Sequence, residues 1–303
     1  MLRLADSPAA WKGDVLVRRT DWIHQLTDVE IAEIDAALGA VRDLPLAEIG
    51  PAEFPLPTLG PTIAEWAAEL ADGRGFLLVR GLPVARYTEQ EAGIVYWGIG
   101  AHLGVPVPQN NDGDLLGHVR DTGEDPADPA VRRYRTRGAQ PFHTDGADIV
   151  GLLCLATSRS GGESSIASSV TVFSEMQRRR PDLVDLFFEP WTFDLYEQQA
   201  PGEQPYMTLP LATAFAGRLF TMYIRFYIEQ AQRHPEVPRL TSRHIEFLDL
   251  VDALAAEHRL DMEFRPGDIQ LLSNAVILHG RTGYEDVPGY PRHLLRLWLS
   301  RRR

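Results

Sequence analysis

The sequence is poor in cysteine, which limits the redox chemistry and the metal sites that it can build. Cys154 is the only cysteine among 303 residues, and it lies in the apolar stretch IVGLLCLA. One cysteine can form neither an internal disulfide nor a cysteine-based zinc site. A free cysteine in such a stretch usually packs as a small hydrophobic residue, and its presence suits a reducing compartment. We therefore expect a cytoplasmic protein.

The sequence also lacks long apolar runs and an excess of positive charge. No stretch approaches the ~18 apolar residues of a membrane span, and the first residues contain no apolar core of a secretion signal. Lys and Arg number 30 against 42 Asp and Glu, which gives a formal net charge of −12. Nucleic acids and anionic membranes attract basic surfaces, so neither is an expected partner.

Capping boxes mark the starts of three predicted helices. In each box a threonine hydroxyl accepts a hydrogen bond from the amide three residues later, and a glutamate there reaches back to the amide of the threonine. The boxes begin at Thr27, Thr62 and Thr88, and the helix that Thr62 opens should end near Gly73. These helices are expected to pack beside the strands.

Short apolar segments bounded by turn residues predict seven strands. They cover 75–82, 115–121, 148–156, 163–170, two segments within 265–280, and 292–300. A mostly helical stretch, about 172–262, separates the last three strands from the others, which suits an antiparallel roll or barrel. The absence of a Gly-rich phosphate loop argues against the common nucleotide-binding folds. We predict a single domain over 1–303, of the β-rich α+β class, with its β core at about 75–170 and 264–300.

Three histidines are followed two residues later by an acid, a spacing found in metal sites. With nine histidines and 42 acids in 303 residues, chance alone gives roughly one such pair. The pairs are His143/Asp145, His234/Glu236 and His244/Glu246. Side chains at i and i+2 share one face of a strand, whereas in a helix they lie about 200° apart.

Local structure separates these pairs. His244 and its acid fall in a predicted helix, so they cannot bind one ion together. His234 belongs to a surface connection that contains two prolines. Only His143 and Asp145 stand on an extended segment that leads into an apolar strand, where both side chains can point at one ion.

A facial metal site needs a third ligand, and two histidines with one carboxylate are typical of non-haem Fe(II) oxygenases. His279, at the end of the apolar segment AVILHG, is the best candidate. The sequence pattern alone does not exclude the strand histidines His118 and His293 as the third ligand. Arg292 and Arg296 follow in a predicted strand with one buried face. A guanidinium there needs an anionic partner, and a carboxylate fits its planar fork best.

Four motifs, in this order, resemble a known family. They are FHTDG, GGES, GDIQLLSNAVILHGRTGYED and RHLLRLWL. The sequence resembles the taurine dioxygenase/2,4-dichlorophenoxyacetate dioxygenase (TauD/TfdA) family of Fe(II)- and 2-oxoglutarate-dependent oxygenases, which has the clavaminate synthase-like fold. The resemblance is specific over about 141–169 and 264–300, and it extends across roughly 75–300. It implies a double-stranded β-helix, or jelly roll, with flanking helices and a helical insertion at about 172–262.

The resemblance also implies which residues bind iron and the cosubstrate. The residues that match the iron ligands are His143, Asp145 and His279. Arg292 matches the arginine that binds the distal carboxylate of 2-oxoglutarate, and Arg296 matches a second arginine that helps with cosubstrate or substrate. Either arginine could be the principal clamp, and we favour Arg292. Ser164 stands where the family usually has a threonine that hydrogen-bonds to the same carboxylate, and it keeps the hydroxyl.

We therefore expect an enzyme that uses Fe(II), 2-oxoglutarate and O2 to hydroxylate an unactivated carbon of a small-molecule substrate, with release of succinate and CO2. Related halogenases lack the carboxylate ligand, so Asp145 argues against halogenation. Desaturation or cyclisation by the same cofactors stays open, as does a redox-silent metal- or ligand-binding jelly roll. A zinc hydrolase with the same ligands would leave Arg292 and Ser164 unexplained.

The segments before the metal pair are expected to cover the site, as they often do in the family. Gln109, Asn110 and Tyr134 are the candidate substrate contacts, although ordinary polar loop positions would look the same. The arginines at 132, 133, 135 and 137 could favour an anionic substrate or form a solvated face. The sequence is also compatible with a homo-oligomer.

Overall fold

The computed structural model describes residues 4, 6–110, 112–125, 131–196, 199 and 202–302. The helices are α1 (Gly13–Leu16), α2 (Asp28–Val41), α3 (Leu59–Asp72), α4 (Glu89–Leu103), α5 (Ser169–Arg179), α6 (Arg225–Gln230) and α7 (Ser242–Glu257). Short 3-10 turns are η1 (Leu46–Glu48), η2 (Val84–Arg86), η3 (Arg133–Arg135), η4 (Pro181–Phe187) and η5 (Ala231–Arg233). Among the described residues, no helix has both the length and the apolar character needed to cross a membrane.

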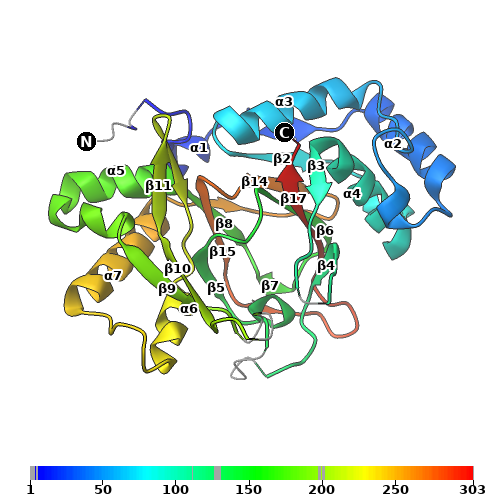
Figure 1. Cartoon of the computed structure of the whole chain (residues 1–303). Helices are drawn as coiled ribbons and strands as arrows, with labels where there is room; N and C mark the ends of the chain where they lie inside the picture. The colour runs from blue at the N-terminus through cyan, green and yellow to red at the C-terminus, as the bar shows by residue number, and fades with distance from the viewer. Residues whose placement is uncertain are drawn as a thin grey trace.

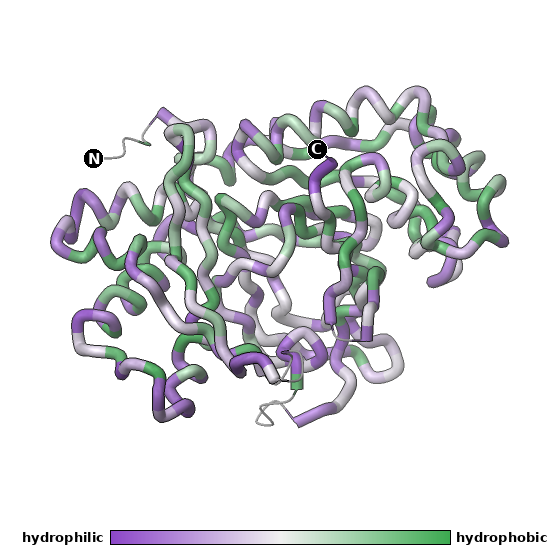
Figure 2. Tube along the Cα trace, in the orientation of Figure 1, coloured by the Kyte–Doolittle hydropathy of each residue, from purple (hydrophilic) through white to green (hydrophobic). Residues whose placement is uncertain are grey.

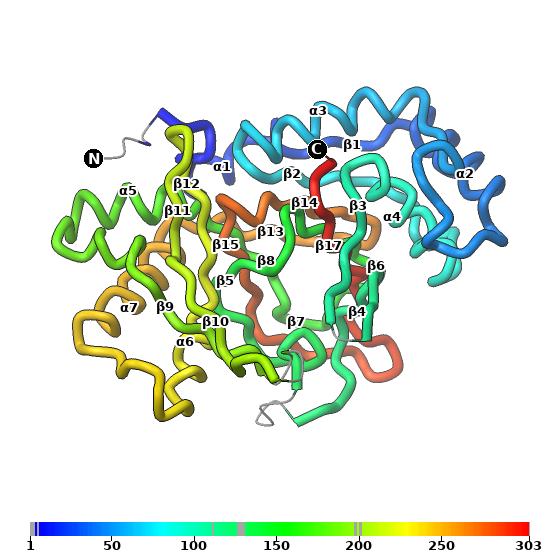
Figure 3. Tube along the Cα trace, viewed as in Figure 1, coloured from blue at the N-terminus to red at the C-terminus, as the bar shows by residue number. Residues whose placement is uncertain are grey.

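The larger of two central sheets joins segments from the whole length of the chain. Its strands are β1 (Ile23–Gln25), β2 (Phe76–Arg80), β14 (Ile269–Ser273), β6 (Ile149–Ala156), β17 (His293–Arg301) and β3 (Gly104–Pro106), in this order, with β4 (Leu116–Val119) also paired to β17. Only β1 and β2 pair in parallel. Figure 3 shows the orange and red C-terminal strands among green and cyan strands from earlier in the chain.

The smaller central sheet carries the strands that lead into the predicted metal site. Its order is β13 (Leu260–Met262), β8 (Ser164–Ser168), β15 (Ile277–Arg281) and β5 (Gln140–His143). One hydrophobic core includes Phe76 and Leu272 of the larger sheet together with Ile166 and Ile277 of the smaller one. The two sheets therefore pack face to face around a shared interior, as the predicted jelly roll requires.

Alternating side chains give the larger sheet two buried faces. Val150 points into the space between the sheets, whereas Ile149 and Leu153 belong to a second core that also contains residues of α2, α3 and α4. These three helices cover the outer face of the larger sheet, while α5 and α7 lie on the opposite side of the molecule (Figure 1). In Figure 2 the helices α3 and α5 alternate between hydrophilic and hydrophobic colours along their length, as expected for helices with one buried face.

Two of the three predicted capping boxes are present. Thr27 and Thr88 each form both hydrogen bonds of the box. The predicted box at Thr62 is wrong, because Thr62 lies inside α3. The carboxylate of Glu33, on α2, instead accepts hydrogen bonds from the amides of Thr58 and the residue after it, at 2.6 and 2.8 Å. A contact from another helix thus caps α3, and the local sequence could not show it.

The stretch predicted as mostly helical, 172–262, also contains strands. Two antiparallel hairpins lie there, formed by β9 (Pro190–Asp194) with β10 (Tyr206–Pro210) and by β11 (Ala212–Phe215) with β12 (Arg218–Thr221). A further two-stranded pair, β7 (Ser160–Gly161) with β16 (Tyr284–Glu285), lies outside this stretch. The prediction of helix was correct for α5 and α7 but missed these hairpins.

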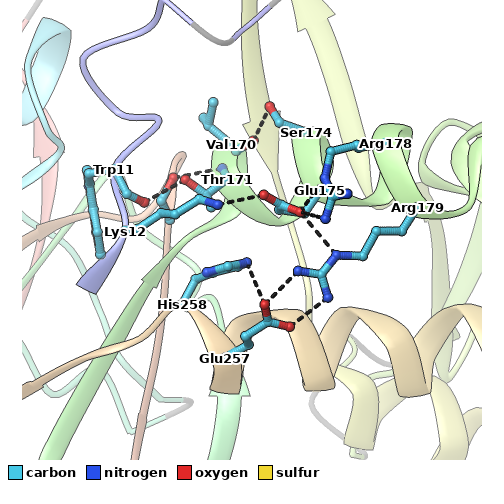
Figure 4. Close-up of polar contacts among 11 residues, drawn as sticks. Trp11, Lys12, Val170, Thr171, Ser174, Glu175, Arg178, Arg179, Glu257 and His258 are labelled. Atoms are coloured by element: carbon cyan, nitrogen blue, oxygen red, sulfur yellow. Dashed lines mark hydrogen bonds and ion pairs between the residues drawn. The ribbon is translucent and has the colours of Figure 1, made fainter. Parts of the chain in front are cut away.

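A polar network ties the N-terminal segment to α5 and α7 (Figure 4). Lys12 donates to Glu175 at 2.6 Å, and the carbonyl of Trp11 accepts from the hydroxyl of Thr171 at 2.6 Å. Glu175 also accepts from Arg178 and Arg179, and the latter reaches on to the carboxylate at 257. Residues far apart in the sequence are thereby joined on the side of the smaller sheet.

Candidate active site

Three predicted metal ligands converge between the two central sheets. His143 ends β5, His279 lies in β15, and these two residues face each other as a cross-strand pair. A carboxylate oxygen of Asp145 lies 3.7 Å from Nε2 of His143, and the other lies 3.6 Å from Nε2 of His279. Metal-binding atoms of all three residues lie within 4.8 Å of one another. The structure therefore brings together the three residues that the sequence selected.

Hydrogen bonding prepares His143 to bind a metal through Nε2. Its Nδ1 lies 2.8 Å from the carbonyl of Pro141, and a carbonyl can only accept, so Nδ1 carries the proton. Nε2 then presents its lone pair towards Asp145. Burial, followed by the nearby His279, lowers the pKa of His143 to about 4, so the imidazole is neutral at physiological pH. A neutral imidazole held in one tautomer is the form that ligates iron.

Neighbours on both sides hold the backbone around Asp145 in place. The amide of Thr144 donates to the carbonyl of Tyr223 at 2.8 Å, and the amide of Tyr223 donates to the hydroxyl of Thr144 at 2.9 Å. The amide of Asp145 donates to the side-chain oxygen of Asn274 at 2.7 Å, and the amide group of Asn274 donates back to the carbonyl of Asp145. The carboxylate is therefore aimed by fixed main chain.

The carboxylate of Asp145 stays ionised although it is buried. Burial alone would raise its pKa, but the charge of Arg296 and the nearby imidazole of His279 outweigh burial and lower the pKa below its usual value. One carboxylate oxygen lies 3.7 Å from Nη1 of Arg296 and also accepts from the indole of Trp298 at 2.9 Å. Two imidazoles and one anionic carboxylate fit a divalent iron ion.

Arg296 lies beside the metal ligands and its position is fixed by neighbours. Its Nε donates to the side-chain oxygen of Gln109 at 2.6 Å, and the amide group of Gln109 donates to the carbonyl of Arg296 at 2.8 Å. The guanidinium lies over the rings of Tyr134 and Trp298, at 4.6 and 4.8 Å. Gln109 is almost fully buried, so it is placed to orient Arg296.

Arg292 occupies a second buried position, away from the iron ligands. One Nη donates weakly to the carbonyl of Gly162 at 3.3 Å, and the other has no hydrogen-bond partner. Gly162 has a φ of +74°, and a Cβ there would lie 2.9 Å from Nε of Arg292. The Gly-Gly turn before Ser164 thus makes room for this guanidinium.

Two further residues of this second position were missed by the sequence reasoning. Arg281 lies directly opposite Ser164 across the β8–β15 pair, and its Nε and Nη1 lack hydrogen-bond partners. The ring of Tyr284 contacts both guanidiniums, at 4.7 Å for Arg281 and 5.1 Å for Arg292, and its hydroxyl is also unpartnered. Within the described part of the chain, neither guanidinium forms an ion pair with a carboxylate.

Burial makes this pair of arginines a prepared anion site. Burial, and then repulsion from Arg292, lowers the pKa of Arg281 to about 10, and burial also lowers the pKa of Arg292. Buried donors without acceptors are costly, and a carboxylate would satisfy several of them at once. Ser164 accepts a hydrogen bond from Gln270 at 3.1 Å and shares this face of the sheet.

A cavity of about 690 Å³ opens beside the metal ligands. Its wall includes His143, Asp145, Arg296 and Trp298, the predicted substrate contacts Gln109, Asn110 and Tyr134, and a cluster formed by Arg132, Arg133, Tyr196, Arg225, Phe226 and Tyr227. The side chain of Asn110 is bonded to Asp114 at 2.8 Å, which closes a local turn. The ring of Tyr134 lies under the guanidinium of Arg296 at 4.6 Å.

The sequence contained a signal for some of the missed residues. Arg281 follows His279 by two positions and Trp298 follows Arg296 by two, so each pair shares one face of its strand. Asn274, in the turn between β14 and β15, had no such signal, because its role depends on a chain segment far away in the sequence.

Comparison with known proteins relates the chain to one family. The model of the family described as "Taurine catabolism dioxygenase TauD, TfdA family" matches residues 40–298. FR-33289 synthase of Streptomyces rubellomurinus is 29% identical, over 96% of this chain and 89% of its own length. The taurine hydroxylase-like protein SAT17 of Stachybotrys chartarum is 32% identical, over 95% of this chain and 77% of its own length.

Solved structures confirm the predicted fold. Asparagine oxygenase, in complex with Fe(II), a 3-hydroxyasparagine and succinate, has a TM-score of 0.70 and 18% identity, over 92% of this chain and 93% of that chain. The non-heme iron oxygenase OrfP, in complex with Fe and alpha-ketoglutaric acid, has a TM-score of 0.69 and 15% identity, over 92% and 94%. The family model covers most of the sequence, and the chain therefore belongs to the taurine catabolism dioxygenase TauD, TfdA family and is an Fe(II)- and 2-oxoglutarate-dependent dioxygenase.

Proposed function

We propose that His143, Asp145 and His279 bind the Fe(II) of this dioxygenase. The observation that carries the proposal is the convergence of their three ligand groups within 4.8 Å. Two of them, His143 and Asp145, line a cavity wide enough for a small molecule. Bound iron supplies the activation of O2, which is coupled to the decarboxylation of 2-oxoglutarate to succinate and CO2 and to the hydroxylation of the substrate.

The protein residues orient these groups and keep water out. Asn274 and Tyr223 fix the main chain of the ligand loop, and Trp298 fixes the carboxylate of Asp145. Such contacts set the direction of metal ligands and tune their basicity. The aromatic rings of Tyr134 and Trp298 exclude water from the side of the site that Arg296 occupies.

Arg292 is the proposed clamp for the distal carboxylate of 2-oxoglutarate, with Ser164, Arg281 and Tyr284 beside it. Its guanidinium has an unpartnered donor, whereas Arg296 is already bonded to Gln109 and lies next to Asp145. This difference supports Arg292 over Arg296 for the clamp. Arg296 is then left to help at the iron end of the cosubstrate or at the substrate.

The substrate is proposed to be a small molecule with an anionic group. Arg133 lies over the ring of Phe226 at 3.8 Å and, among the described residues, has no ion-pairing carboxylate. Arg225, in contrast, is neutralised by three acids. Relatives with anionic compounds in their names include a uridine-5'-phosphate dioxygenase of Amycolatopsis, which is 26% identical over 54% of this chain, and the taurine hydroxylase-like protein.

Substrate-free conversion of 2-oxoglutarate to succinate tests the iron site. Purified protein with Fe(II) and O2 should form succinate slowly, and Asp145→Ala should reduce the rate by at least about 100-fold, because it removes a metal ligand. Glu236→Ala, in the rejected His-x-acid pair, is the matched control and should keep the rate. An active Asp145→Ala variant would overturn the ligand assignment.

Screening for faster succinate formation tests the substrate class. The first compound that speeds succinate formation is compared with a matched compound that lacks the anionic group, as uridine does relative to uridine 5′-phosphate. The compound that carries the anionic group should give the faster succinate formation. For that hit, Arg133→Gln should raise KM about tenfold, which corresponds to one lost charge-assisted hydrogen bond, with the KM for 2-oxoglutarate unchanged. A neutral hit that is unaffected by this variant would exclude the proposal.

We also propose a cytoplasmic location and one continuous domain. Cys154 is buried and has no second cysteine to pair with, which suits a reducing compartment. Cell fractionation tests the location. Limited proteolysis tests the domain, since a single domain should yield no stable fragment that lacks either half of the sheets.

A further inference from the structure

A second cluster of two histidines and one carboxylate lies outside the active site. Glu89 is the first residue of α4, His118 lies in β4, and His293 begins β17. Nδ1 of His118 is 2.9 Å from Nε2 of His293 and 3.6 Å from Glu89. Nδ1 of His293 is 3.7 Å from the other oxygen of Glu89. None of the three residues lines the cavity beside the iron ligands.

The surroundings of this cluster leave it accessible to a dissolved ion. The side chain of His293 is 10% exposed, whereas those of His118 and Glu89 are 40% and 54% exposed. The two imidazole rings stack at 5.1 Å with 29° between their planes. Their facing nitrogens must share one proton when no cation is present, because each neutral ring offers one donor and one acceptor.

We propose that Glu89, His118 and His293 bind a divalent transition metal ion of the zinc type. Imidazole nitrogens with one carboxylate are ligands that Zn²⁺ accepts, and three protein ligands leave a fourth position for water. Two nitrogens at ordinary zinc–nitrogen distances on one tetrahedral ion lie about 3.3 Å apart. The rings therefore need to separate by only a few tenths of an ångström.

The site would join three elements that are otherwise linked by strand pairing and packing. β4 and β17 are already neighbours in the larger sheet, and α4 packs on β17. An ion here would fix the start of β17, one residue after Arg292. Because such an ion binds only the folded chain, it would also raise the melting temperature.

Zinc titration by calorimetry tests the second site apart from the first. Wild-type protein should bind two equivalents of Zn²⁺, since zinc also occupies iron-type ligand sets. His143→Ala/Asp145→Ala should bind one equivalent, and adding His118→Ala should remove it. In the wild-type background, His118→Ala alone should reduce the stoichiometry from two to one, which keeps the test valid if the double variant folds poorly.

The carboxylate has its own test and control. Glu89→Gln should weaken zinc binding at this site about tenfold, because the ion loses its anionic ligand. Glu48→Gln, at an exposed acid elsewhere, should leave the affinity unchanged. Visible absorption of bound Co²⁺ gives an independent readout of a site with few ligands. The proposal is overturned if a folded double variant binds no Zn²⁺, or if His118→Ala in the wild-type background still binds two equivalents.

Discussion

Two clusters of arginine side chains in this molecule differ in whether their positive charge is paired with carboxylates of the protein. Around Glu175, the cations Lys12, Arg178 and Arg179 all donate to one carboxylate, and the last of them also reaches Glu257 (Figure 4). Every charge in this network has a partner within the protein. Its formation therefore stabilises the folded chain.

The cluster of Arg281, Arg292 and Tyr284 has no such balance. Both guanidiniums are more than nine-tenths buried, and three of their N–H-bearing nitrogens lack acceptors. Burying charge without a partner costs stability. This difference is the reason that we propose anion binding for this cluster and a structural role for the cluster around Glu175.

The largest expected effect comes from replacing Arg292, the proposed clamp for the distal carboxylate of 2-oxoglutarate. Arg292→Met should weaken 2-oxoglutarate binding by at least about 100-fold, because a buried charge-assisted pair is lost. The same variant without ligand should be at least as stable as the parent, since it removes an unpaired buried charge. Calorimetric titration and thermal unfolding measure the two effects. A strongly destabilised variant would show that Arg292 is structural.

Replacing Glu175, at the centre of the paired cluster, should have the reverse effect: it should lower the stability and leave 2-oxoglutarate binding unchanged. Glu175→Gln leaves three cations without their anion, and we expect the free energy of unfolding to fall by about 2 kcal/mol. The affinity for 2-oxoglutarate should not change. Glu257→Gln, whose carboxylate is exposed, is the matched control and should cause a much smaller loss. Urea unfolding of the two variants provides the comparison.

The stabilising effect of Glu175 should also depend on pH. Its hydrogen bond to Lys12, opposed by burial and aided by Arg178, lowers the pKa from 4.5 to about 2. The contribution of a carboxylate with a lowered pKa is complete above the ordinary value and is lost as the pH falls towards the lowered one. Unfolding free energy measured between pH 5 and pH 2 should therefore fall less steeply in Glu175→Gln than in the parent.

Smaller effects should follow from the residues around the clamp. Arg281→Met is expected to raise the KM for 2-oxoglutarate about tenfold, because a second cation leaves the site. Its Nη2 donates to the carbonyls of Thr136 and Arg133, so the KM for the substrate should rise as well. Tyr284→Phe, which removes one hydroxyl, should raise the KM for 2-oxoglutarate only about threefold. An unchanged KM in both variants would confine the anion site to Arg292 and Ser164.

Local patterns were sufficient to predict the parts of the fold that depend on neighbouring residues. Seven strands of the two sheets and the boxes at Thr27 and Thr88 follow from periodicity and from contacts three residues apart, whereas the short strands β1, β3 and β13 were not predicted. The start of α3 depends on Glu33 of another helix. In the hairpins within 172–262, the strands β10 and β11 bury little apolar surface that alternation could reveal. Those features were invisible to a reading of the local sequence.

The residues of the candidate site also divide into those that local sequence patterns could predict and those that they could not. His143 and Asp145 were identified by strand geometry, and the i, i+2 relation could also have identified Arg281 from His279. The support that Asn274 gives to the ligand loop arises only when 145 and 274 meet in space. The family resemblance supplied the ligand set, whereas the balance of charge around Arg292 became visible only in three dimensions.

The direct pairing of His143 with His279 across β5 and β15 would make the proposed iron site a marker of folding. These residues are 279 − 143 = 136 positions apart, so their contact closes a long loop, and contacts of this kind form late. A slip of one residue in the pairing would turn one imidazole to the other face of the sheet. The visible absorption of a metal ion that binds during refolding would therefore report when β5 and β15 have paired in register.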